Sequence, residues 1–173
     1  MKEKFAGVRG VYLGLGSNIE DPALQIQNAI TALNETSGIK VLMDSGYFKS
    51  KPMGPKDQPD YLNAVVEIET DLDAEALLES CQKIEELQGR VKKRHWGERT
   101  IDLDILLYAD QIITRKDLTI PHPGICSRDF VYMPLLKINP ELQVPGKGML
   151  KNIVESANEI ESDFACQFVG NVE

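Results

Sequence analysis

The most restrictive feature of this sequence is an apolar strand that carries two aspartates and follows a cationic loop. Residues 101–108 are Ile-Asp-Leu-Asp-Ile-Leu-Leu-Tyr. Because side chains alternate along a strand, Asp102 and Asp104 share one face, whereas the apolar residues between and beside them share the other. The segment therefore predicts a sheet with one face in an apolar core and two carboxylates, roughly 6.6 Å apart along the strand, on the other.

The loop before this strand concentrates positive charge in an acidic protein. The 173 residues carry 19 Lys and Arg against 27 Asp and Glu, a net charge of −8, yet five of those cations lie between residues 90 and 99. Alone, such a run is typical of a solvated loop, and an Asp-x-Asp pair is typical of a solvent-facing strand. Together, and against the overall charge, they predict a site where basic groups and a hard divalent cation bind phosphate oxygens.

The length and composition predict one soluble globular domain spanning residues 1–173. No apolar run approaches the roughly 18 residues needed to cross a bilayer, and the charged segment at residues 1–5 does not resemble a secretory signal, so we expect a cytoplasmic protein. The acidic charge argues against nucleic acid as a partner. We expect small-molecule substrates, no membrane partner and a monomer.

The cysteines predict neither a disulfide framework nor a zinc site. They are Cys81, Cys126 and Cys166, an odd number without a Cys-x-x-Cys pair. Cys81 falls on the apolar face of a predicted helix, where it is expected to pack in the core.

The order of expected elements predicts the fold class. Apolar periodicity predicts strands at 11–18, 39–48, 61–70, 101–108 and 163–169, and helices beginning at 22 and spanning 74–88, 128–138 and 150–160. This order is close to strand–helix–strand–strand–helix–strand, the ferredoxin-like α+β plan: an antiparallel sheet with helices on one face, here with additional C-terminal elements. The fold alone does not give an activity.

Two predicted helices have apolar stripes that should face the sheet. Asp21 and Asp73 are the expected N-caps, with Pro22 at the first helical position and Gly89 ending the second helix. Periodicity alone places Gln82 and Glu85 on the solvated surface. The stripes consist of Leu24, Ala29, Ile30 and Leu33 in the first helix, and of Ala74, Leu77, Leu78, Cys81, Ile84 and Leu87 in the second.

Three further segments are candidates for function. Gly14-x-Gly16 has the first two glycines of a dinucleotide fingerprint, but Ile19 occupies the third position, so we interpret it as a structural strand-to-helix turn. Residues 50–60 contain three prolines and a glycine and must form a loop. His122 lies between two prolines and is held in an extended backbone.

Taken in order, these motifs resemble the 6-hydroxymethyl-7,8-dihydropterin pyrophosphokinase family of folate biosynthesis. The resemblance covers residues 10 to 143, and it implies transfer of the pyrophosphoryl group of ATP to the hydroxymethyl oxygen of the pterin, with release of AMP. It rests on the segments 13–18 (Leu-Gly-Leu-Gly-Ser-Asn), 54–63 (Gly-Pro-Lys-Asp-Gln-Pro-Asp-Tyr-Leu-Asn), 90–104, 120–123 (Ile-Pro-His-Pro) and 128–131 (Arg-Asp-Phe-Val).

The resemblance also implies the site residues. Asp102 and Asp104 match the ligands of two magnesium ions that bridge ATP, and Arg90 and Arg99 match arginines that bind its phosphates. The positions that match the rest of the ATP site are Gln82, Glu85, Lys92, Trp96, Ile105, Thr119, His122 and Arg128. The positions that match the pterin site are Ser50, Pro52, Met53, Tyr61, Asn63 and Phe130; for Phe130 the residues alone leave core packing equally open.

The sequence departs from the family at Glu98, where a proline is usual, at Lys92, a frequent arginine, and at Gly124, where a basic residue is common. The loop at 89–96 is also one residue shorter than in some members. Two other function classes stay open: nucleotidyl transfer, which would use the same carboxylates and release pyrophosphate, and a pterin or nucleotide sensor without turnover.

Overall fold

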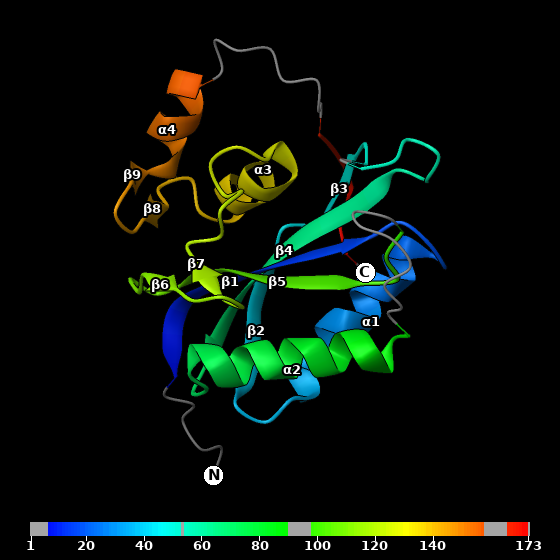
Figure 1. The fold of residues 1–173 in the computed structure, drawn as a ribbon, viewed down its shortest axis with the longest axis horizontal. Helices are drawn as coiled ribbons and strands as arrows, with labels where there is room; N and C mark the ends of the chain where they lie inside the picture. Colours follow the sequence, from blue (N-terminus) through cyan, green and yellow to red (C-terminus); the bar gives the residue numbers. More distant parts are fainter. Residues whose placement is uncertain (1–6, 53, 90–97, 158–165, 173) are drawn as a thin grey trace.

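The computed structural model describes residues 7–52, 54–89, 98–157 and 166–172 (Figure 1). Its centre is a six-stranded antiparallel sheet in the order β10-β3-β4-β1-β5, with β2 also paired to β4. The strands are β1 (Val8–Ser17), β2 (Ile39–Asp44), β3 (Tyr47–Ser50), β4 (Tyr61–Thr70), β5 (Asp102–Tyr108) and β10 (Gln167–Gly170). The antiparallel sheet within an α+β architecture confirms the expected fold class.

The remaining elements are helices and two small ribbons. The helices are α1 (Pro22–Glu35), α2 (Ala74–Leu87), α3 (Asp129–Ile138) and α4 (Leu150–Ala157). The ribbons are β6 (Ile113–Thr114) with β7 (Thr119–Ile120), and β8 (Gln143–Val144) with β9 (Gly148–Met149). In Figure 1, α1 and α2 lie on one side of the sheet, and α3 and α4 lie on the other. The helices expected on one face are thus α1 and α2, and the additional C-terminal elements cover the opposite face.

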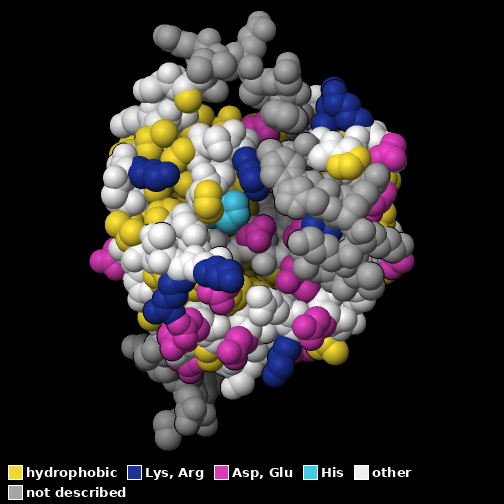
Figure 2. All heavy atoms as spheres, viewed as in Figure 1, with side chains coloured by type: hydrophobic (Ala, Val, Ile, Leu, Met, Phe, Trp, Pro, Cys, Tyr) yellow, Lys and Arg dark blue, Asp and Glu magenta, His cyan; other side chains and the backbone are white. Residues whose placement is uncertain are grey.

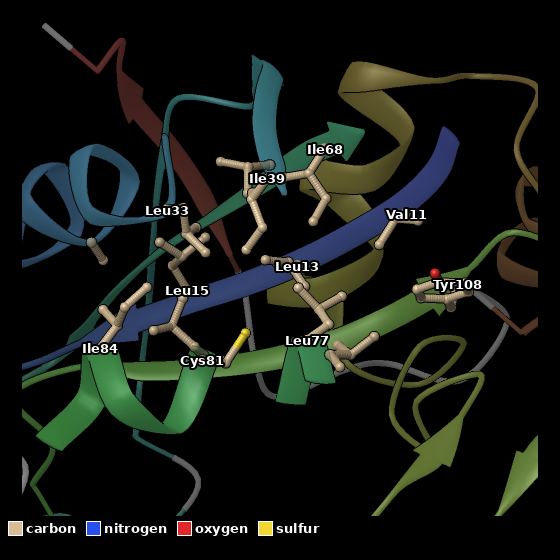
Figure 3. Close-up of a cluster of buried hydrophobic side chains, with 14 of the residues drawn as sticks. Val11, Leu13, Leu15, Leu33, Ile39, Ile68, Leu77, Cys81, Ile84 and Tyr108 are labelled. Carbon is tan, nitrogen blue, oxygen red and sulfur yellow. The ribbon is translucent and has the colours of Figure 1, made fainter. Parts of the chain in front are cut away.

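The first face of the sheet and the helices α1 and α2 enclose the larger core (Figure 3). Both helices begin as expected: the Asp21 side chain accepts from Leu24 N (3.4 Å), and the Asp73 side chain accepts from Ala76 N (2.8 Å). The predicted stripes are largely buried, but two assignments are wrong. Leu24, in the first turn of α1, is 46 % exposed, and Leu87, the last residue of α2, is 85 % exposed. Ile26 is buried in α1 instead.

The second face carries a separate core that covers only part of the sheet. Tyr12 from β1, Val65 from β4, and Leu106 and Leu107 from β5 pack there against α3, α4 and the segments between them. Their partners are Ile125, Val131, Tyr132, Leu135, Leu142, Val144, Leu150 and Val154. Toward the C-terminal end of β1, the residues of this second face do not belong to the smaller core.

The strand predicted at 39–48 is interrupted at Ser45 and Gly46. Gly46 has a positive φ of 76°, and the Asp44 side chain accepts from its backbone N–H (2.9 Å). Ser45 forms two hydrogen bonds with Val65, both of 2.9 Å. Its backbone N–H donates to the Val65 carbonyl, and its Oγ accepts from the Val65 N–H. The two halves, β2 and β3, therefore pair with successive parts of the same strand, β4.

The C-terminal expectations are confirmed with shorter bounds. The predicted helices 128–138 and 150–160 correspond to α3 and α4, and the strand predicted at 163–169 corresponds to β10, which runs from Gln167 to Gly170. Residues 158–165, which include the predicted end of the last helix and the start of this strand, lie outside the described residues. The three cysteines are free. Within the described ranges, no helix is long and apolar enough to cross a membrane.

Candidate functional site

A cavity of about 240 Å³ opens on the second face, next to the smaller core. Its walls come from β1, β4, β5, the end of β3 and the start of α3. On the surface drawn in Figure 2, acidic side chains and a histidine border a hollow near the middle of the view. The lining residues are Gly14, Leu15, Gly16, Ser50, Lys51, Gly54, Tyr61, Asn63, Ala64, Val65, Arg99, Asp102, Asp104, Leu106, His122, Arg128, Phe130 and Val131.

Two glycines of β1 form the floor between the aspartates and β4. Gly16 pairs with Asp102 on one side and with Asn63 on the other, and Gly14 pairs with Asp104 and with Val65. Both glycines lie inside the strand, so the interpretation of this motif as a strand-to-helix turn is wrong. A Cβ on Gly16 would stand 3.5 Å from Asn63 Oδ1. The missing side chains thus leave the space beside the carboxylates open.

The carboxylate end of the cavity is held by a buried asparagine that sequence reasoning did not assign. Asn18 Oδ1 accepts from Arg99 N (2.9 Å), and its Nδ2 donates to Gln58 Oε1 and to Pro59 O (both 3.0 Å). Arg99 is 7 % exposed, and its Nε lies 3.6 Å from Asp102 Oδ2. One side chain therefore joins the end of β1 to the 51–60 loop and to Arg99, three residues before β5. Asn18 is the last residue of the 13–18 motif, and this was the only feature of the sequence that could have marked it as a site residue.

Glu85 is not a freely solvated residue of α2, as periodicity alone suggested. It is half-buried, and its Oε2 accepts from the backbone N–H of Leu103 (3.1 Å), between the two aspartates of β5. The aspartates themselves project as expected: Leu103 and Ile105 are buried in the larger core, Asp102 is half-buried and Asp104 is exposed. Glu85 thus fixes α2 to the strand that bears the carboxylates.

The cavity also has aromatic and amide groups, on the side of β1 that faces β4. Tyr61, Asn63 and Phe130 line it, with Ser50 beside them. Asn63 Nδ2 donates to Phe48 O (3.0 Å) and to Ser50 Oγ (2.8 Å), so both amide hydrogens are used within the protein. Of the amide, only the carbonyl oxygen could then accept a hydrogen bond from a ligand.

His122 and Arg128 form the side of the cavity nearest α3. Burial, and next the positive charge of Arg128, lower the pKa of His122 from 6.5 to about 4, so the imidazole is neutral at pH 7. Its Nδ1 accepts from Gly124 N (3.0 Å), which places the proton on Nε2. A Cβ on Gly124 would stand 2.6 Å from Arg128 Cδ. Gly124, where the family commonly has a basic residue, thus leaves space for the Arg128 side chain.

Several sequence-predicted residues are not brought to the cavity. Gln82 and Thr119 are exposed on α2 and β7, and Pro52 is buried outside the cavity lining. The Ile105 side chain packs in the larger core, on the face away from the cavity. Met53, Arg90, Lys92, Trp96 and most of the cationic loop lie outside the described residues. The structure thus joins Ser50, Tyr61, Asn63, Arg99, Asp102, Asp104, His122, Arg128 and Phe130 in one cavity.

Comparison with solved structures supports this architecture. The structure is similar to crystal structures described as HPPK-DHPS, one of them from Plasmodium falciparum, with TM-scores of 0.67 and sequence identities of 16 % and 14 %. The similarity covers 90 % and 88 % of this chain, and 45 % and 44 % of those chains. The chain therefore spans less than half the length of these solved structures, and at this identity the likeness concerns the fold.

The sequence comparisons are more specific. Residues 12–140 match the family described as 7,8-dihydro-6-hydroxymethylpterin-pyrophosphokinase (HPPK). A 2-amino-4-hydroxy-6-hydroxymethyldihydropteridine pyrophosphokinase of Haemophilus influenzae is 46 % identical over 83 % of this chain and 90 % of its own. One of the same name from Methylorubrum extorquens is 43 % identical over 79 % and 86 %. The chain therefore belongs to the 7,8-dihydro-6-hydroxymethylpterin-pyrophosphokinase family.

Proposed function

We propose that this chain transfers the pyrophosphoryl group of ATP to the hydroxymethyl oxygen of 6-hydroxymethyl-7,8-dihydropterin, giving the pterin diphosphate and AMP in folate biosynthesis. The proposal rests mainly on one observation: a single cavity contains both a pair of carboxylates and a group of aromatic and amide side chains. Asp102 and Asp104 stand on β5, on one side of the β1 glycines, and Tyr61 and Asn63 stand on β4, on the other side; Phe130 lines the same cavity. Membership of the pyrophosphokinase family supports the same reaction.

The carboxylate end fits magnesium. Mg²⁺ prefers oxygen ligands and usually retains water or substrate phosphate in its shell, so it needs only one or two carboxylates from the protein. Asp102 and Asp104 are the two that would hold it, and we infer two ions shared with ATP. In the described part of the chain, no group of three or more His, Cys, Asp and Glu residues forms a metal site. Bound magnesium would neutralise charge on the triphosphate and polarise its oxygens.

The chain's own residues position the phosphates. Arg99 is nearly buried, lines the cavity and lies beside Asp102, so burial and the ion pair restrict its guanidinium. The neutral His122 has Nε2–H as its remaining donor, and Arg128 adds a positive charge on the same side. In phosphoryl transfer, positioning and charge stabilisation account for most of the catalysis, so a dedicated strong base is not required.

The pterin end suits a flat heterocycle. Tyr61 and Phe130 provide aromatic faces, and the Asn63 oxygen accepts from an N–H at the ring edge. We assign backbone groups of Ser50, Pro52 and Met53 to the same edge. From the family resemblance, we assign Arg90 to the phosphates, and Gln82, Glu85, Lys92, Trp96, Ile105 and Thr119 to the nucleotide.

The test is product identity. The purified chain is mixed with magnesium, ATP and 6-hydroxymethyl-7,8-dihydropterin, and nucleotides are separated by chromatography. We expect AMP and pterin diphosphate in equal amounts, and no AMP when magnesium is chelated. Release of pyrophosphate would indicate nucleotidyl transfer instead. Formation of ADP, or tight pterin binding without any turnover, would also refute the proposal.

A further inference from the structure

A buried carboxylate separates two cavity residues at the start of α3. Asp129 lies between Arg128 and Phe130, and it is only 6 % exposed. Its Oδ2 accepts a hydrogen bond of 2.9 Å from the backbone N–H of Cys166, 37 residues along the chain. Its Oδ1 is buried and has no hydrogen-bond partner within the described residues. The carboxylate thus connects the start of α3 to the residue that precedes β10.

Burial of this carboxylate is unfavourable, which argues that the position has a specific role. Desolvation raises the pKa of Asp129, and the N–H groups of Cys166, Phe130 and Asp129 itself counteract the rise only in part. An apolar residue of similar size would avoid this cost. What an apolar residue would lose is the hydrogen bond to Cys166.

The C-terminal strand is also attached to the other wall of the cavity. β10 pairs with β3 through Phe168 opposite Phe48 and Gln167 opposite Lys49, and β3 ends at Ser50, which lines the cavity. The rings of Phe48 and Phe168 meet edge to face at 5.4 Å. The segment 166–170 therefore contacts β3 through β10 and the start of α3 through the hydrogen bond from Cys166 to Asp129.

A second contact between α3 and β10 lies near the other end of the helix. Lys137 Nζ stands 3.5 Å from the centroid of the Phe168 ring and donates to Ser45 O (2.8 Å). Both ends of α3 are thus fixed to the sheet edge formed by β3 and β10. Of the two contacts, only that of Asp129 lies beside residues of the cavity.

We propose that Asp129 is a positioning residue: its hydrogen bond to the Cys166 N–H holds the start of α3 against the C-terminal strand and so fixes Arg128 and Phe130 relative to Ser50. This inference rests on the proposed function, because those residues are its substrate contacts. It gives the C-terminal segment, which lies beyond residues 12–140 of the family match, a part in substrate binding.

The kinetic test uses two pairs of variants. Asp129→Ala removes the acceptor, and Asp129→Asn keeps an oxygen that can accept from Cys166. Cys166→Pro removes the backbone donor, and Cys166→Ala removes only the thiol. A hydrogen bond of about 1 kcal/mol corresponds to a change of roughly fivefold, within a range of about twofold to tenfold. We expect Asp129→Ala and Cys166→Pro to raise the KM values for pterin and ATP by that factor with little change in kcat, and both conservative variants to stay within twofold of the wild type.

Two controls separate positioning from simple destabilisation. Leu135→Ala removes a fully buried side chain from the middle of α3, and should lower the melting temperature without changing either KM. The double variant Asp129→Ala/Cys166→Pro should be no worse in KM than either single variant, because both remove the same bond. Unchanged KM values in Asp129→Ala, or additive effects in the double variant, would overturn the inference.

A measurement without turnover keeps the two proposals distinguishable. Amide hydrogen exchange in Asp129→Ala should become faster in residues 129–132 and 166–170 together, relative to Asp129→Asn. If wild-type protein forms no AMP, the proposed function fails, while exchange still decides whether the contact exists. If wild-type protein forms AMP and exchange in residues 166–170 is unchanged by Asp129→Ala, the positioning role fails alone.

Discussion

The two faces of the sheet are built from the same strands but are filled differently. On the first face, Leu13 and Leu15 of β1 are buried under α1 and α2. On the second face, the intervening positions are Gly14 and Gly16, and neighbouring strands place Asn63 and two aspartates beside them. Alternation along β1 thus lets Leu13 and Leu15 stabilise the fold while Gly14 and Gly16 border the cavity. Changes on the two faces should therefore separate activity from stability.

The largest effect should come from the exposed carboxylate of the second face. Asp104→Ala is expected to lower kcat/KM by at least about 10³-fold, or about 4 kcal/mol, because it would remove one of the two carboxylates that we propose as magnesium ligands. Its urea midpoint should stay close to that of the wild type, because Asp104 packs in neither core. Near-normal turnover in this variant would contradict the assignment of Asp104 as a magnesium ligand.

The matching change on the first face should have the opposite signature. Leu77 of α2 is fully buried, and Leu77→Ala should lower the free energy of unfolding by about 3 kcal/mol in urea titrations. The protein that stays folded at low temperature should keep wild-type KM values. A rise in either KM of Leu77→Ala at a temperature where the variant is fully folded would show that the two faces are more strongly coupled than their separate cores suggest.

A smaller effect should follow pH through His122, which borders the cavity. Because its pKa falls from 6.5 to about 4 on folding, the unfolded chain binds more protons between these values, and stability is lost as the pH falls through that window. We expect wild-type protein to lose about 2 kcal/mol relative to His122→Gln between pH 7 and pH 4. Parallel stability curves for the two proteins would contradict the buried, neutral imidazole.

The smallest predicted effect concerns the cavity floor. The Cβ of Gly16→Ala would make only ordinary contacts, 3.5 Å from Asn63 Oδ1 and 3.8 Å from Tyr61 Cδ1, so the fold should tolerate it. The methyl group would still occupy the floor, and we expect a rise of a few-fold, about 1 kcal/mol, in the KM for pterin. Calorimetry with unreactive pterin analogues would measure the same loss without turnover.

Local patterns predicted the sheet and the larger core because apolar residues recur every second position in the strands and every three or four positions in the helices. The extent of helix contact could not be predicted: Leu24 and Leu87 continue the stripes, but they lie in terminal turns and stay exposed. Strict alternation also fails in β5, where the register shifts between its pairs with Tyr12 and Leu13. Leu106 and Leu107 consequently both belong to the smaller core, and Tyr108 to the larger one.

The site was predictable only in part, for a related reason. Asp102, Asp104, Tyr61 and Asn63 stand on strands, whose alternation fixes their face, and the structure places them in one cavity. Gly14 and Gly16 have no side chain to reveal a role, so their function as a floor depended on the register with β4 and β5. Asn18 and Asp129 act through backbone groups distant in sequence, and no local pattern records such partners.

The glycine floor has a consequence for how such a protein tolerates change. Glycine in a strand weakens it by roughly 0.5 to 1 kcal/mol relative to alanine. Of the three glycines in β1, Gly14 and Gly16 form the cavity floor, where β1 is paired with both β4 and β5. Selection for heat resistance alone would therefore favour alanine at both positions, since the backbone has room for it. If the floor binds ligand as proposed, ligand binding and thermal stability make opposite demands on these two positions.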